Sequence, residues 1–207
     1  MSPLTDEERR FLLRLARQNL EAAVRGEQKP SPSEVPRGLC EPAGAFVSLH
    51  QQGLLRGCIG YLHALRPLYR TVMEAAAAAA LHDPRFAPVR PPELPEVHLE
   101  ISVLSTFRAI RPGEIQVGEH GLLIVQDRQQ GLLLPQVAFE HQWDREQFLE
   151  ETCRKAGLPP DAWRRGAVIE AFTADVFREE LPAGAEWKGL AGAIPAPPGR
   201  PGKFPPG

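Results

Sequence analysis

The chain has 207 residues, of which 43% are hydrophobic and 24% are charged, a composition typical of a soluble globular protein. Its formal net charge of −2 gives no general attraction to nucleic acids or anionic membranes. The amino terminus lacks a basic segment followed by an apolar run, and no apolar stretch reaches the ~20 residues needed to cross a bilayer. These features predict a cytoplasmic protein with no membrane segment, built as one domain or as two closely joined lobes.

The chain contains three cysteines, Cys40, Cys58 and Cys153. They are odd in number, far apart in sequence and not arranged in a CxxC pair, which argues against a disulfide framework and a zinc knuckle. The simplest placement is a reducing compartment.

The first predicted element is a helix over 5–26. Thr5 caps it while Glu8, three residues later, reaches back, and Gly26 offers a stop. The proline-rich segment 28–44 follows, and we expect a loop or extended arm there because proline removes hydrogen-bond donors and fixes the backbone.

A β-hairpin is predicted next, over 45–62, with its turn at Gln52 and Gly53. A helix over 67–81 can begin at its proline, and its alanine-rich surface would let it lie very close to a sheet or to another backbone. The segment 96–105 alternates like a strand, with His98, Glu100 and Ser102 on one face and apolar residues on the other.

The segment 120–140 suggests a second hairpin, closed around Gln130-Gly131. A helix over 144–157 follows, capped by an aspartate and ended by a glycine. The segment 167–180 alternates like one strand. The glycine- and proline-rich tail, 188–207, is predicted to be disordered.

The strands occur in sequential hairpins rather than in βαβ crossovers. This order favours an α+β fold with a largely antiparallel sheet flanked by helices. Two successive hairpin–helix–strand passages also suggest an internal structural duplication.

The stretch LRGCIG is the most distinctive short motif of the chain. If it forms a regular strand, Arg56 and Cys58 share a face and lie about 7 Å apart, so that the guanidinium would favour a reactive thiolate. Gly57 and Gly60 suggest close approach by a ligand or by a neighbouring backbone. The alternative is a buried cysteine that acts as a small hydrophobe, with glycines that make room for the alanine-rich helix.

LRGCIG is followed by an alanine-rich helix and by DPRF, ISVLS, HG, LPQVA, WD and KAGL in the same chain. With these motifs the chain resembles the AMMECR domain family, whose prokaryotic members are called AmmeMemoRadiSam system protein A. The resemblance places an AMMECR domain over residues 1–187, with the proline-rich loop and the tail as departures from it.

The resemblance implies an α+β fold with a larger lobe, a smaller lobe and a cleft. It also implies partnership with a radical S-adenosylmethionine enzyme and a Memo-type protein, in a reaction that the family does not define. Carried onto this sequence, it gives Cys58 and Glu100 as candidate catalytic residues. The candidate ligand-binding residues are Arg56, Gly57, Ile59, Gly60, Asp83, Arg85, Pro135 and Gln136.

Three of these candidates outside the hexapeptide have a structural alternative. Arg85 lies on a loop suited to binding, or it covers the last carbonyls of the preceding helix. Glu100 could handle protons with His98 and Ser102, or it could lie on a solvated outer face of the sheet. Gln136 could bind a ligand or cap exposed backbone groups.

The six histidines show no HxxxH or HExxH spacing, and the chain has neither a cysteine cluster for iron–sulfur binding nor a nucleotide-binding loop. The sequence therefore predicts no metal site and identifies no cofactor. Three functions stay open. They are an enzyme or enzyme subunit that uses Cys58 on a small anionic substrate, a non-catalytic adaptor or ligand-binding protein, and, ranked last, a nucleic-acid-binding protein.

Overall fold

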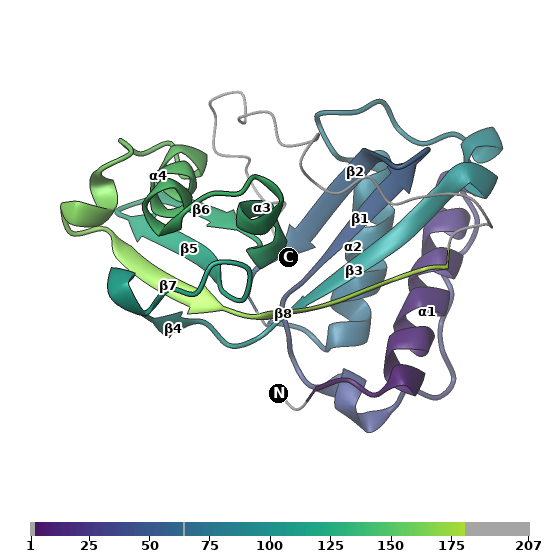
Figure 1. The fold of residues 1–207 in the computed structure, drawn as a ribbon. Coiled ribbons are helices and arrows are strands. Elements are labelled where there is room, and N and C mark those ends of the chain that lie inside the picture. Colours follow the sequence, from purple (N-terminus) through teal and green to yellow (C-terminus); the bar gives the residue numbers. More distant parts are fainter. Residues whose placement is uncertain (1–2, 64, 181–207) are drawn as a thin grey trace. The chain divides into compact units, whose positions relative to one another are not determined.

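The structure is a computed structural model that describes residues 3–63 and 65–180. These residues divide into two compact units: unit 1 comprises 3–63, 65–106 and 174–180, and unit 2 comprises 107–173. Each unit combines an antiparallel sheet with helices (Figure 1). The predicted α+β class is therefore confirmed. The predicted tail lies outside the described residues.

Unit 1 contains a four-stranded antiparallel sheet, sheet 1, with the strand order β2-β1-β3-β8. Its strands are β1 (Ala45–Gln51), β2 (Leu54–Tyr61), β3 (Val97–Leu104) and β8 (Ala174–Arg178). Gln52 and Gly53 join β1 to β2, both with positive φ, at 53° and 77°. This is the backbone that a two-residue hairpin turn requires, so the predicted hairpin is confirmed.

Two long helices cover one face of sheet 1 (Figure 1). Helix α1 (Asp6–Arg25) begins with the predicted Thr5–Glu8 capping box and ends at Gly26, whose φ is 69°. Helix α2 (Leu68–Leu81) starts directly after Pro67. The sheet side chains that meet these helices are fully buried and form the core of unit 1: Val47, Leu49, Leu99 and Ile101.

Unit 2 contains sheet 2, with the strand order β4-β7-β5-β6 and antiparallel pairing throughout. Its strands are β4 (Arg108–Ala109), β5 (Gly121–Gln126), β6 (Gln129–Leu133) and β7 (Val168–Phe172). Its helices are α3 (Pro135–Glu140) and α4 (Arg145–Lys155), and α4 has the predicted capping box between Asp144 and Gln147. Short 3₁₀ helices occur at Arg37–Cys40, Pro91–Glu96, Pro112–Glu114 and Ala162–Arg164.

Two predicted elements of the second half are wrong in detail. The second hairpin turns at Asp127 and Arg128, because Asp127 adopts the left-handed conformation with φ 55°. Gly131 instead lies within β6, where an added Cβ would be 2.3 Å from the backbone nitrogen of Ala156. The single predicted strand over 167–180 is two strands, β7 and β8, which belong to different sheets.

The two sheets repeat one topology. In each, a hairpin is followed by a helix that packs on it and by a strand that pairs antiparallel with the first hairpin strand. The series is β1, β2, α2 and β3 in unit 1 and β5, β6, α3, α4 and β7 in unit 2, where the short helix α3 is an addition. A fourth strand pairs with that last strand in each unit: β8, which follows the series of unit 1, and β4, which precedes the series of unit 2. The repeat that the sequence suggested is thus present in the strand connections.

Among residues 3–63 and 65–180, we find no helix long and apolar enough to cross a membrane.

Candidate functional site

Cys58 lies in β2, at one edge of sheet 1, on a row of polar residues that crosses all four strands. It is paired with Ser48 on β1, Ser48 with Glu100 on β3, and Glu100 with Arg178 on β8. Since side chains alternate along a strand and Val47 faces the helices, the side chains of this polar row lie on the other face of the sheet. The register of the sheet therefore aligns a thiol, a hydroxyl, a carboxylate and a guanidinium.

The backbone of Cys58 points away from β1 and is held by Asp83 and Arg85, which follow the end of α2. The Cys58 N–H donates to Asp83 Oδ2 at 2.8 Å, and Arg85 Nη2 donates to the Cys58 carbonyl oxygen at 3.2 Å. Cys58 and Ser48 consequently form a non-hydrogen-bonded pair, in which side chains come close. Ser48 Oγ lies 3.2 Å from Cys58 Sγ and donates to it.

Asp83 and Arg85 form a two-pronged ion pair. Arg85 Nε donates to Asp83 Oδ1 at 2.9 Å, and Arg85 Nη2 donates to Asp83 Oδ2 at 2.7 Å. The side chain of Asp83 is only 2% exposed. Burial alone would raise its pKa, but the hydrogen bonds from Arg85 and from the Cys58 amide outweigh burial and lower that pKa. Asp83 therefore carries a fixed negative charge next to the backbone of β2 at Cys58.

The thiol of Cys58 is protonated at neutral pH, because its pKa is raised. Cys58 is half-buried, and burial is the largest cause that raises the pKa of its thiol. The hydrogen bond from Ser48 and the charge of Arg85 favour the thiolate, whereas Asp83 and Glu100 oppose it, and the net shift is upward. A positive charge does favour the Cys58 thiolate, as the sequence suggested. The charge is that of Arg85 rather than Arg56, and burial outweighs its effect on the pKa of Cys58.

Arg56 does not take the position that a regular strand would give it. The pairing register shifts between Leu49 and His50, so Arg56 faces no residue of β1 and forms a β-bulge. Its guanidinium binds Glu93 Oε1 through Nε at 3.0 Å and the Ala87 carbonyl through Nη1 at 2.8 Å. The expectation that Arg56 acts on Cys58 as its neighbour two residues along a regular strand is therefore wrong.

The glycines of the hexapeptide make room for the protein itself. A Cβ on Gly57 would lie 2.2 Å from the carbonyl oxygen of Ala79 in α2, and one on Gly60 would lie 2.2 Å from the ring of Phe46. At Gly57 the space is therefore occupied by the backbone of the alanine-rich helix, as the second interpretation of the motif expected. At Gly60 it is occupied by an aromatic side chain. Ile59 packs against the core of unit 1.

The alternative that Glu100 lies on a solvated outer face of the sheet is wrong. Glu100 is 7% exposed, Ser102 2% and His50 3%, and all three lie on the face of the polar row. Burial, helped by the positive charge of Arg178 and by His98, lowers the pKa of His50 to about 4. These three residues are therefore buried polar groups on this face of sheet 1.

Pro135 and Gln136 belong to unit 2, unlike the other predicted site residues. Pro135 is the buried first residue of α3, so it begins a helix rather than ending a strand. Gln136 is half-buried, and its Nε2 has no hydrogen-bond partner in the part of the chain that the structure describes.

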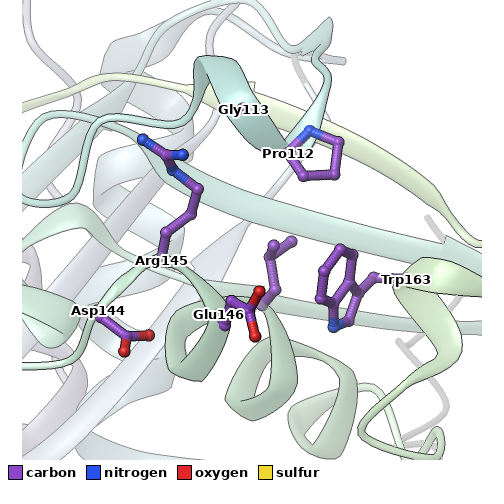
Figure 2. Close-up of a pocket in the computed structure, with 7 residues that line it drawn as sticks. Pro112, Gly113, Asp144, Arg145, Glu146 and Trp163 are labelled. Atoms are coloured by element: carbon purple, nitrogen blue, oxygen red, sulfur yellow. The ribbon is translucent and has the colours of Figure 1, made fainter.

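Unit 2 also contains a pocket of about 240 Å³ that sequence reasoning missed. In Figure 2, Arg145 and Glu146 project from the start of α4, and the Trp163 indole and the Pro112 ring lie to one side. The buried side chain of Leu149 also lines the pocket, and Arg145 Nε donates to a backbone carbonyl at 3.1 Å. The capping of α4 was visible in the sequence, but no local pattern indicates a cavity.

The described residues contain no group of three or more His, Cys, Asp or Glu side chains placed to hold a metal ion.

Comparisons with known proteins give consistent matches over most of the chain. A protein-family model described as AMMECR1 matches residues 13–177. A protein from Thermococcus gammatolerans is 45% identical over 197 residues, which covers 89% of this chain and 96% of the relative. One from Methanosarcina barkeri is 43% identical over 191 residues, or 87% and 95% of the two chains. The crystal structure of an uncharacterized protein from Pyrococcus horikoshii has a TM-score of 0.82 and 41% identity, covering 87% of this chain and 96% of that one.

Proposed function

Because the chain belongs to the AMMECR1 family, we propose that it is a component of a cytoplasmic enzyme system whose other members are a radical S-adenosylmethionine enzyme and a Memo-type protein. In this proposal the chain contributes a binding surface around Cys58, and the partners contribute the reactive centre. The resemblance of its sequence motifs supports the choice of partners.

The observation that carries the binding role is the combination of a fixed backbone and a neutral thiol at Cys58. Asp83 and Arg85 hold both backbone polar groups of this residue, while burial keeps its sulfur protonated. A thiol is a much weaker nucleophile than a thiolate. The arrangement therefore suits a surface of constant shape better than covalent chemistry.

The ion pairs of the two arginines support the same role. Arg85 is paired with Asp83 and Arg56 with Glu93. A guanidinium that is neutralised by a carboxylate has less capacity to attract a free anion. These arginines fix the strand and the neighbouring loop, and the support for a small anionic ligand at this site is correspondingly weaker.

The test is a binding measurement between the purified chain and each proposed partner from the same organism. We expect a complex with at least one of them, and we expect Cys58→Ser to bind within about twofold of the wild type because serine keeps the size and polarity of the site. Arg85→Gln should weaken binding about tenfold, since it removes a charge-assisted contact that orders the strand. Arg165→Gln, at an exposed ion pair in unit 2, is the matched control.

The partnership is refuted if the chain forms a complex with neither of the two partners.

A second candidate function is an enzyme subunit that uses Cys58 as a nucleophile, and one observation favours it: the Ser48 hydroxyl and Arg85 both stabilise a thiolate. Loss of cellular function in a folded Cys58→Ser variant that still binds its partner would establish this second function in place of the binding role.

A further inference from the structure

In unit 2, Arg108 and His120 bring two hydrogen-bond donors into contact. Arg108 begins β4, and His120 directly precedes β5 and is 4% exposed. Nδ1 of His120 accepts the backbone N–H of Gln116 at 3.1 Å. Nε2 of the same ring lies 3.2 Å from Nη2 of Arg108.

The number of protons on these groups leaves one donor without an acceptor. A neutral imidazole carries one N–H, and because Nδ1 accepts from Gln116, the proton is on Nε2. A guanidinium has donors only, so the Nε2–H of His120 faces an N–H of Arg108. The other tautomer moves the conflict to Gln116, whose N–H would then face Nδ1–H. In an imidazolium both conflicts are present.

We propose that Arg108 and His120 form a binding site for a small dissolved oxyanion, of the carboxylate or phosphate class. An oxygen placed between Nε2–H and the guanidinium accepts from both, which turns a donor–donor contact into two hydrogen bonds, one of them charge-assisted. His120 forms the buried end of the site, and Arg108 is exposed to the solvent from which the anion enters.

Arg108 is suited to this role because its guanidinium has few other polar contacts. Its side chain makes no ion pair with a carboxylate in the described part of the chain, and its one hydrogen-bonding contact there is with His120. Arg56 and Arg85, by contrast, each have a carboxylate partner. The positive charge of Arg108 is therefore available to an incoming anion. This inference concerns unit 2 and does not depend on the proposed function of the Cys58 surface.

The site can be tested by NMR on the full chain with ¹⁵N-labelled histidine. Without oxyanions in the buffer, we expect His120 to be the Nε2–H tautomer. Adding inorganic phosphate or acetate should shift the Nε2–H signal in a saturable way, whereas sodium chloride at equal ionic strength should not. A response to acetate alone assigns the site to carboxylates, and a response to both assigns it to oxyanions in general.

The variant for this test is Arg108→Gln, which should weaken phosphate and acetate binding at least about tenfold by removing the charged donor. Arg128→Gln, at an exposed arginine in the β5–β6 turn of the same unit, should bind as the wild type does. The proposal is overturned by an Nδ1–H tautomer in the wild type or by an unchanged Nε2–H signal with both anions. Equal binding by the wild type and Arg108→Gln would overturn it as well.

Discussion

Asp83 contacts Cys58 through the backbone and not through the sulfur, with Asp83 Oδ2 accepting the Cys58 N–H at 2.8 Å. Because β2 is an edge strand, its outward N–H and C=O groups have no neighbouring strand to pair with. At Cys58, Asp83 and Arg85 make the two backbone hydrogen bonds that a neighbouring strand would otherwise make. The two motifs LRGCIG and DPRF therefore form one structural element, in which the second blocks the edge formed by the first.

We predict that Asp83→Asn lowers the free energy of unfolding by about 2 kcal/mol, because hydrogen bonds to a charged group contribute roughly 1.5–3 kcal/mol. The amide keeps an acceptor for Cys58 but loses its attraction for Arg85. Urea denaturation at neutral pH measures the change. Asp161→Asn, which breaks an exposed ion pair with Arg165, is the control and should leave the midpoint nearly unchanged.

The same pair has a defined pH dependence. The pKa of Asp83 is lowered in the folded state, so the unfolded chain takes up the proton first as the pH falls. The contribution of Asp83 is fully present above about pH 4, the ordinary pKa of aspartate, and is lost as the pH falls through the lowered value. A wild type and an Asp83→Asn variant whose stabilities stay equally far apart down to pH 2 would contradict this assignment.

Cys58 should react slowly with iodoacetamide at neutral pH. Burial raises the pKa of its thiol, whereas Cys40 is exposed, so mass spectrometry of partially alkylated protein should find the label on Cys40 first. Ser48→Ala removes a hydrogen bond that favours the thiolate and should slow the reaction of Cys58 further. Labelling of Cys58 ahead of Cys40 in the folded protein would show an activated thiol and would support the nucleophile function.

The elements with local causes could be predicted from the sequence. The Thr5–Glu8 and Asp144–Gln147 capping boxes and the turn at Gln52 and Gly53 depend on residues at most a few positions apart. Gly131 looks like another turn residue, but it is glycine because the backbone of Ala156 packs against it. That contact joins a strand to the end of a helix, which no short sequence window contains.

The site depends on register, which alternation alone does not give. A regular hairpin closed at Gln52 and Gly53 would pair Cys58 with Val47, on the face that meets the helices. The bulge at Arg56 adds one residue to β2 and places Cys58 opposite Ser48, on the polar face. Ser48 was missed for this reason. The bulge is held by contacts of Arg56 with Glu93 and Ala87, more than thirty residues further along the chain.

His50 predicts a second pH dependence, at higher pH. Its pKa is lowered to about 4 in the folded state against about 6.5 in the unfolded chain, so the unfolded chain binds more protons between these values. The free energy of unfolding should therefore decrease from pH 6.5 to pH 4, by at most about 3 kcal/mol from this residue. His50→Gln should flatten the decrease, whereas His63→Gln should keep it because His50 is intact. Equal slopes in the wild type and His50→Gln would contradict the assignment.

Gly57→Ala is predicted to be the most damaging single-methyl change among these variants. The added Cβ would lie 2.2 Å from the carbonyl oxygen of Ala79, and that oxygen belongs to the backbone of α2 and cannot rotate away. Overpacking in a well-packed core costs about 1–3 kcal/mol, and we expect the upper end of that range because a whole helix must shift. Thermal unfolding measures the effect. Gly113→Ala is the matched control, since no atom lies within 4 Å of its added Cβ and its melting temperature should hold or rise slightly. If the two variants melt at the same temperature, Gly57 does not set the distance between β2 and α2.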